Sequence, residues 1–191
     1  MISPVDGAKG KKKLRPLDIP TVKDTVVQSE MLKMLSPLAE AVFTDSSYGF
    51  RKGRGVHDAV LKAQEYIAAG YTYIVDVDIS KFFNNVNHNL CLDRLRRIAP
   101  DADVLALVRR FMRAPSRERS GKTIVRPSWH AGIPQGGPLS PLLANVVLND
   151  LDWELAGRGL PFVRYVDDLI ALTRRNTAAQ RTLRTITGTL E

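Results

Sequence analysis

The sequence holds a single cysteine, Cys91, among its 191 residues. One thiol can form neither an internal disulfide nor a cysteine-based zinc site, so a disulfide-stapled scaffold and a zinc module are both excluded. Cys91 lies in an apolar helical pattern, which predicts a buried structural thiol in a reducing compartment. No apolar run approaches the roughly twenty residues needed to span a bilayer, and no charged-then-apolar leader opens the chain. We therefore expect a cytoplasmic protein with no membrane partner.

Negative charge is also in short supply. The chain has 28 Lys and Arg against 20 Asp and Glu, a formal charge of +8 and a pI near 9.8. Such a balance favours a polyanionic partner such as nucleic acid, although a merely solvated basic surface gives the same composition. Hydrophobic residues make up 44% of the chain, which is enough for a packed core.

Two adjacent carboxylates, Asp167 and Asp168, interrupt an apolar segment that runs from Arg164 to Ile170. The flanking Val, Tyr, Leu and Ile residues indicate strands, so the pair is expected at a tight hairpin bend. Adjacent anions near apolar strands are costly unless a cation accompanies them, and hard oxygen ligands suit Mg²⁺ or Mn²⁺. The alternative is an ordinary Asp-Asp turn exposed to solvent.

Residues 71–83 begin as a β-branched, aromatic strand that carries two further acids, Asp76 and Asp78. A strand alternates its side chains with a period of two, so both carboxylates share one face with Ile74. Val75 and Val77 belong to the opposite face. Periodicity cannot choose between the two acids.

Three loops have compositions that suit nucleic acid. A basic run, Lys9 to Arg15, is expected on a strand-turn-strand that contacts phosphates, and a merely soluble basic loop is the alternative for this segment. Residues 43–55 interleave aromatics, glycines and cations, which suits stacking and pairing with a single strand. Residues 132–141 hold three glycines and three prolines, and such a rigid loop could lie beneath a base pair or sugar.

Several helices are predicted from apolar spacing and capping residues. The stripe Val27, Met31, Met34, Leu35 and Leu38 predicts a core helix interrupted near Pro37, and Val56 to Ile67 a second helix closed by Gly70. Asn87 is expected to cap a helix that carries Cys91, with another over 104–111, and both should have Arg-rich outer faces. Ser140 should cap a long apolar helix that starts at Pro141. Leu183, Ile186 and Leu190 indicate a final helix, and 114–131 a polar hairpin that turns at Gly121-Lys122.

Five ordered motifs carry a resemblance to a known family. They are Arg15-Pro16-Leu17 with 19–24 and Gln28, Ser47-Tyr48-Gly49-Phe50-Arg51 with 57–59, Asp78-Ile79 with Phe82-Phe83, the loop 132–142, and Tyr165-Val166-Asp167-Asp168. Together they resemble the fingers and palm of reverse transcriptases, closest to those encoded by bacterial group II introns.

The resemblance implies an α+β fold with partial fingers over 1–70 and a palm over 71–191. The antiparallel palm sheet should use residues near 72–79, 161–166 and 168–173, and no thumb is expected within the chain. By this resemblance Asp78, rather than Asp76, is the metal-binding acid of its strand and lies close to Asp167 and Asp168. The Ile79 carbonyl is an additional ligand. The implied cofactor is two Mg²⁺ ions, which Mn²⁺ could replace. The implied nucleotide-binding residues are Lys13, Arg15, Phe82, Gln135 and Gly136. The candidate nucleic-acid contacts are Tyr48, Arg51, Arg54 and Tyr165.

The implied activity is RNA-directed DNA synthesis from an RNA template, a DNA or RNA primer and deoxynucleoside triphosphates, with intron RNA as a further candidate partner. A CRISPR-associated reverse transcriptase would share these motifs. Two other classes stay open: a noncatalytic splicing helper would use the basic loops without needing the acids, and a metal-dependent phosphodiesterase would use the acids without the 132–138 loop. We expect the chain by itself to lack segments needed for processive synthesis.

Overall fold

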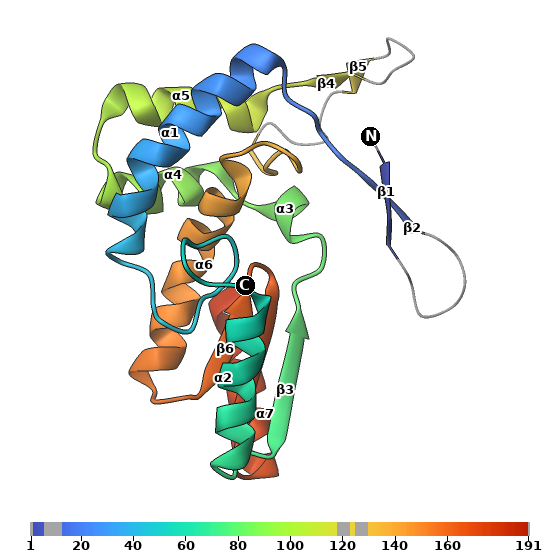
Figure 1. The fold of residues 1–191 in the computed structure, drawn as a ribbon, viewed down its shortest axis with the longest axis vertical. Helices are drawn as coiled ribbons and strands as arrows, with labels where there is room; N and C mark the ends of the chain where they lie inside the picture. The colour runs from blue at the N-terminus through green and yellow to red at the C-terminus, as the bar shows by residue number, and fades with distance from the viewer. Residues whose placement is uncertain (1, 6–12, 118–122, 125–129, 191) are drawn as a thin grey trace. The chain divides into compact units, whose positions relative to one another are not determined.

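The computed structural model describes residues 2–5, 13–117, 123–124 and 130–190 (Figure 1). Its strands are β1 (Ile2–Val5), β2 (Lys13–Pro16), β3 (Tyr73–Asp78), β4 (Ser116–Arg117), β5 (Thr123–Ile124), β6 (Phe162–Tyr165) and β7 (Asp168–Thr173). Its helices are α1 (Val22–Glu40), α2 (Val56–Ala68), α3 (Phe82–Asn85), α4 (His88–Ile98), α5 (Ala102–Arg113), α6 (Ser140–Gly157) and α7 (Asn176–Leu190). The mixed α+β class is as predicted.

The chain packs as two compact units, each built from two separate segments. The first unit comprises Met1–Pro37 and Phe83–Ser140, and the second comprises Leu38–Phe82 and Pro141–Glu191. Segments distant in sequence thus pack together within each unit, and the division into fingers over 1–70 and a palm over 71–191 stays a prediction. All three candidate catalytic acids fall in the second unit.

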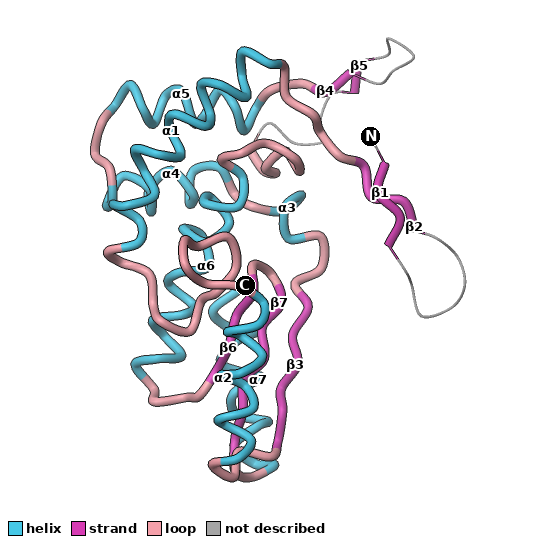
Figure 2. The backbone as a smooth tube through the Cα atoms, in the orientation of Figure 1, coloured by secondary structure: helices cyan, strands magenta, loops and turns pink. Residues whose placement is uncertain are grey.

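The second unit is organised around an antiparallel sheet with strand order β3-β7-β6 (Figure 2). The three strands match the predicted segments. On one face Val75, Leu169 and Ala171 are buried against helices α6 and α7. The partners on that side include Leu151, Leu155 and Ile186, which complete an apolar core. The predicted alternation of β3 is therefore present, and it buries Val75 while Asp76 and Asp78 are exposed.

The other face of the sheet is covered over β6 by helix α2. Val163 is buried there with Ala59 of α2 and with Tyr48 from the preceding loop. Helix α2 begins after Gly55, whose backbone N–H donates to Asp58 Oδ2 at 2.8 Å, and it ends before Gly70, which has φ +91°. Helix α2 thus covers this face of the sheet over β6, while Asp76 and Asp78 of β3 remain exposed.

In the first unit β1 pairs antiparallel with β2, and β4 with β5. Both predicted hairpins therefore have paired strands, although the expected turn at Gly121-Lys122 lies outside the described residues. Helices α4 and α5 pack against each other, and Asn87 caps α4 by accepting from the N–H groups of Asn89 and Leu90. Cys91 is fully buried, and this burial raises the pKa of its thiol to about 12.

Two helix predictions, for α1 and α6, need correction. Helix α1 continues through Pro37 to Glu40. Its buried face follows Gln28, Met31, Leu35 and Ala39, so Val27, Met34 and Leu38 lie on the flank and are 41%, 50% and 46% exposed. Helix α7 forms where it was predicted, with Ile186 buried and Leu183 and Leu190 exposed. Helix α6 begins at Ser140 itself, whose hydroxyl donates to the Pro134 carbonyl at 2.5 Å.

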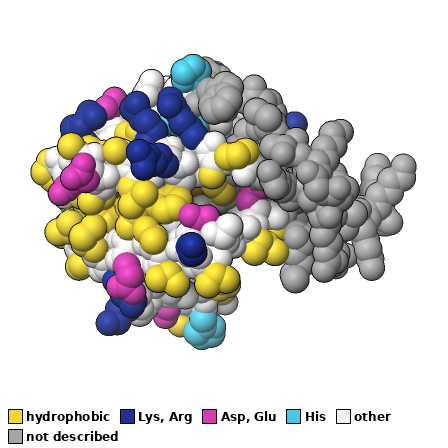
Figure 3. Space-filling view, turned by 90° about the horizontal axis from the view of Figure 1, so that it is seen from above, with side chains coloured by type: hydrophobic (Ala, Val, Ile, Leu, Met, Phe, Trp, Pro, Cys, Tyr) yellow, Lys and Arg dark blue, Asp and Glu magenta, His cyan; other side chains and the backbone are white. Residues whose placement is uncertain are grey.

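Apolar side chains also gather at the surface, as the face drawn in Figure 3 shows. Val22 and Val26 at the start of α1 are 82% and 58% exposed. No helix in the described part of the chain is long and apolar enough to cross a membrane.

A buried ion pair joins β6 to α6 within the second unit. Arg164 and Asp152 both have fully buried side chains, with Nε to Oδ1 at 2.7 Å and Nη2 to Oδ2 at 2.5 Å. Burial raises the pKa of Asp152, and the Arg164 guanidinium opposes that rise. A bidentate pair of this kind is tolerated in a core only because each charge satisfies the other.

Asp152→Ala should therefore leave the buried Arg164 guanidinium without a counterion and lower the free energy of unfolding by about 3–5 kcal/mol. The matched control is Glu154→Ala on the same helix, which removes an exposed pair with Arg158 and should cost at most about 1 kcal/mol. Urea unfolding followed by circular dichroism measures both. Equal losses in the two variants would contradict this account of the buried pair.

Candidate active site

The register of the sheet brings two of the predicted acids face to face. Asp78 at the end of β3 pairs with Asp168 at the start of β7, and Asp168 pairs on its other side with Tyr165 of β6. Paired residues on antiparallel strands present their side chains on the same face. Asp78, Asp168 and Tyr165 therefore form one row across the three strands.

The same register distinguishes Asp76 from Asp78, which sequence periodicity could not do. Asp76 pairs with Ile170, which in turn pairs with Val163. Apart from Asp76 the row is apolar, and Ile170 and Val163 pack beside α2. Asp78 is the acid whose neighbour across the strands is another carboxylate.

The third acid, Asp167, lies in the two-residue turn between β6 and β7. Its turn partner, Val166, is buried and has φ +61°. A β-branched residue rarely adopts this left-handed conformation, which costs about 1–3 kcal/mol. The predicted hairpin bend is thus present, and its backbone is strained at the residue immediately before the two aspartates.

The donor types at this end of the sheet are those that a hard divalent cation prefers, namely carboxylate and carbonyl oxygens. The Ile79 carbonyl, the predicted helper, accepts from the Phe82 N–H at 3.2 Å, and a carbonyl oxygen has a second lone pair. Within the described residues, no three His, Cys, Asp or Glu side chains already converge as a metal site. The fold supplies two facing carboxylates, and Asp167 directly precedes one of them, Asp168, in the chain.

The glycine-rich loop 132–138 belongs to the first unit and is built on close backbone contacts. Gly136 has φ +124°, and a Cβ there would lie 2.6 Å from the Asp18 carbonyl oxygen. The Asp18 N–H donates to the Gln135 carbonyl at 2.6 Å. Gln135 is half-buried and Gly136 is exposed. The loop therefore requires glycine at 136 for both conformation and space.

Residues 83–88 hold the start of that loop from the other side. The Gly132 N–H donates to the Val86 carbonyl at 2.8 Å, and the Ile133 N–H donates to the Phe83 carbonyl at 2.6 Å. His88 is buried, and its Nε2 lies 2.6 Å from the Gly132 carbonyl oxygen. His88 thus positions a loop, and no spacing in the sequence indicated this role.

The candidate nucleic-acid residues of the 43–55 loop are bonded mainly within the protein. The Arg51 guanidinium is buried, pairs with Glu40 at 2.5 Å and also donates to the Thr44 and Ser47 carbonyls. Arg54 pairs with Asp45, which lowers the pKa of that carboxyl. Any contact of these guanidiniums with a phosphate would compete with those bonds.

The aromatic candidates differ in exposure. Tyr48 is only 8% exposed and packs in the core beside α2. Tyr165 is half-buried, and its ring centre lies 6.5 Å from that of Phe50, a residue that is 66% exposed. Phe82 begins the short helix α3 and is buried. Lys13 and Arg15 lie on β2, in register with Val5 and Ser3.

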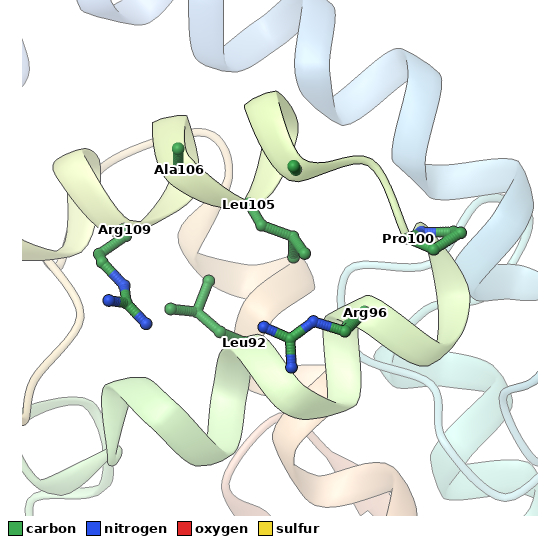
Figure 4. A pocket seen from close by; sticks show the side chains of 7 residues that line it. Leu92, Arg96, Pro100, Leu105, Ala106 and Arg109 are labelled. Carbon is green, nitrogen blue, oxygen red and sulfur yellow. The ribbon is translucent and has the colours of Figure 1, made fainter.

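A shallow groove between α4 and α5 is a further surface feature of the first unit (Figure 4). Leu92 and Leu105 form its apolar floor. The side chains of Arg96 from α4 and Arg109 from α5 extend toward each other across Leu92, and Arg96 also pairs with Asp93 at 2.7 Å. Of the arginines predicted on the outer faces of these helices, Arg96 and Arg109 therefore flank an apolar strip.

Comparison with known proteins identifies similar sequences in bacteria. The protein YkfC of Escherichia coli is 36% identical over 156 residues, which cover 80% of this chain and 40% of YkfC. The group II intron-encoded protein LtrA of Lactococcus lactis is 37% identical over 146 residues, covering 75% of this chain and 23% of LtrA. The chain thus spans less than half the length of these relatives.

Among solved structures, telomerase from Candida albicans superimposes with a TM-score of 0.64 over 85% of this chain and 32% of that protein, at 12% identity. This likeness supports the fold alone. The family described as reverse transcriptase (RNA-dependent DNA polymerase) matches residues 7–191. The chain belongs to the reverse transcriptase family.

Proposed function

We propose that the protein is an RNA-directed DNA polymerase of the group II intron-encoded type, or a derived CRISPR-associated form, that copies RNA into cDNA. The observation that carries the proposal is the row of Asp78 and Asp168 beside the Asp167 turn in a chain of this family. A noncatalytic splicing helper, the alternative, would have no need of three acids at one end of a sheet.

The three aspartates would hold two Mg²⁺ ions, with Mn²⁺ as a substitute. Such cations, when bound, activate the primer 3′ hydroxyl and offset the charge of the departing pyrophosphate. The contribution of the chain is to fix the carboxylates. Asp78 and Asp168 are set by the strand register, and Asp167 by the turn.

The other predicted residues would bind the nucleotide and the nucleic acid. Lys13 and Arg15 would grip the triphosphate, and Gln135 with Gly136 would contact the incoming nucleotide or the template. Phe82 would crowd a ribose 2′ hydroxyl. Tyr48, Arg51, Arg54 and Tyr165 would border the RNA, with the two arginines acting chiefly through the loop that they hold together. The partners are an RNA template, a primer and deoxynucleoside triphosphates, with intron RNA as a further candidate.

The decisive experiment is primer extension on an RNA template with Mg²⁺ by the full-length native protein. Asp78→Asn and Asp167→Ala should each lower the rate at least about 100-fold, because several kcal/mol of transition-state stabilisation is lost. Asp76→Asn is the matched control, since Asp76 lies on the same face two residues earlier and faces Ile170. It should retain near-native activity. RNA affinity should change little in all three variants, because phosphate contacts persist.

Full extension by Asp78→Asn or Asp167→Ala would remove that residue from the mechanism. Equal losses for Asp76→Asn and Asp78→Asn would show that the sheet face, rather than one row of it, is required. A native protein that binds RNA but extends no primer would favour the splicing-helper alternative.

Sugar discrimination should depend on Phe82, which follows Asp78 by four residues and begins α3. A ring beneath the nucleotide sugar excludes a 2′ hydroxyl by steric clash. Phe82→Val should therefore raise incorporation of ribonucleotides relative to deoxynucleotides, measured as the ratio of the two kcat/KM values. Phe83→Val is the control, because it shortens the adjacent ring. If the ratio changes only in Phe83→Val, the role belongs to Phe83.

A further inference from the structure

Arg164, directly before Tyr165 and the turn, uses every N–H donor of its buried guanidinium. Besides the two bonds to Asp152, Nη2 donates to Ser47 Oγ at 2.8 Å. Nη1 donates to Asn145 Oδ1 at 2.9 Å and to the Val166 carbonyl at 2.8 Å. A guanidinium has five N–H groups in a fixed fork, so each bond constrains the direction of the others.

The Val166 carbonyl is the point at which this network reaches the candidate active site. Val166 is the strained residue at φ +61°, and its carbonyl carbon is joined directly to the Asp167 nitrogen. A strained conformation persists only where the surroundings over-determine it. The bond from Arg164 fixes the peptide plane that leads into Asp167.

Asn145 of α6 connects both sides of the strained residue. Its Oδ1 accepts from Arg164, and its Nδ2 donates to the Gly49 carbonyl at 2.8 Å. Gly49 in turn lies against Val166: a Cβ at position 49 would come within 2.6 Å of Val166 Cγ2 and 2.7 Å of its nitrogen. Asn145 is itself 1% exposed. One side chain thus holds the donor to the Val166 carbonyl and the segment packed against Val166.

We infer that Asn145 is a positioning residue for Asp167, acting through Arg164 and Gly49 on the Val166 peptide. The expected loss of rate rests on the proposed polymerase function, whereas the expected change in the Val166 turn does not. Loss of the Asn145 amide would let the Val166 turn relax and would displace the Asp167 carboxylate. Displacement by about 1 Å can cost up to about 100-fold in rate.

The test compares Asn145→Ala with Asn149→Ala, one helical turn later on α6. Asn149 is the matched control because its Nδ2 also donates to a loop carbonyl, that of Val42 at 3.2 Å. It has no bond to Arg164 or Gly49 among the contacts of the described residues. Both variants are assayed below their unfolding transitions, so that the folded fraction does not enter the comparison.

Asn145→Ala should lower kcat for primer extension about 10- to 100-fold, raise the Mg²⁺ concentration required for half-maximal rate, and leave RNA affinity unchanged. Asn149→Ala should match the native protein in all three. A purely structural role for Asn145 predicts kcat within about twofold of that of Asn149→Ala when both are folded, and this result would overturn the inference.

A second readout is independent of activity. In the metal-free protein, the backbone amide resonances of Val166 and Asp167 should shift or broaden in Asn145→Ala and stay in place in Asn149→Ala. Unmoved resonances in Asn145→Ala would overturn the inference even if its activity fell. If the native protein extends no primer, the proposed function fails while this comparison still decides the positioning role.

Gly49→Ala perturbs the same turn from the opposite side. It therefore tests the inference even if Asn145→Ala does not fold. The added methyl must push Val166 away, so the same resonances and the same kinetic constants should change. Gly55→Ala is its control, because a Cβ there meets only Asp58 Oδ2 at 3.7 Å, an ordinary contact. Normal Mg²⁺ dependence and unmoved resonances in Gly49→Ala would count against the inference.

Discussion

The second unit depends on the fully buried guanidinium of Arg164. A cation removed from water is tolerated only if every donor finds an acceptor, because an unpaired buried charge costs several kcal/mol. Arg164 meets this requirement with the Asp152 carboxylate, the Asn145 amide, the Ser47 hydroxyl and the Val166 carbonyl. Since these acceptors come from α6, the loop before α2 and the β6–β7 turn, satisfying the charge fixes all three together.

The geometry of the acids follows from the sheet that this charge anchors. The backbone of Arg164 is itself tied to the loop before α2: its N–H donates to the Ser46 carbonyl, and its carbonyl accepts from the Tyr48 N–H. The register then sets Asp78 opposite Asp168, while α6 and α7 bury the reverse face. The carboxylates thus sit on a rigid scaffold, which is what positions charged groups most accurately. The strain at Val166 is the exception, and it occurs beside the residues proposed to do the chemistry.

In the first unit the 132–137 loop is held by main-chain hydrogen bonds and close backbone packing rather than by a buried charge. Residues 16–20 and 83–88 contact the 132–137 loop through main-chain hydrogen bonds, and glycine at 136 and 137 makes room for Asp18 and Gln28. A Cβ at 137 would lie 2.6 Å from Gln28 Oε1. The loop keeps exposed backbone at Gly136 while its flanks are held, a combination suited to close approach by a planar ligand.

Local chemistry was enough to predict much of this structure. The alternation of β3, the Asp-Asp bend, the Asn87 cap and the buried Cys91 all follow from short-range rules, because strand periodicity, capping and thiol burial depend on neighbouring residues. The choice of Asp78 over Asp76 came only from family resemblance, until the register supplied a physical reason.

Burial and long-range partners could not be predicted in this way. The loop around Arg51 has the composition of a phosphate-binding loop. The Arg51 guanidinium nevertheless pairs with Glu40, eleven residues earlier. Val27, Met34 and Leu38 share the apolar spacing of Met31 and Leu35 and differ only in what lies opposite. Nothing in the sequence near Arg164 distinguishes it from a surface cation. Its hydrogen bonds to Asn145 and to Ser47, 117 residues away, exist only in the folded structure. Sequence determined the secondary structure and the candidate acids, while tertiary packing decided which polar groups lose water and must therefore pair.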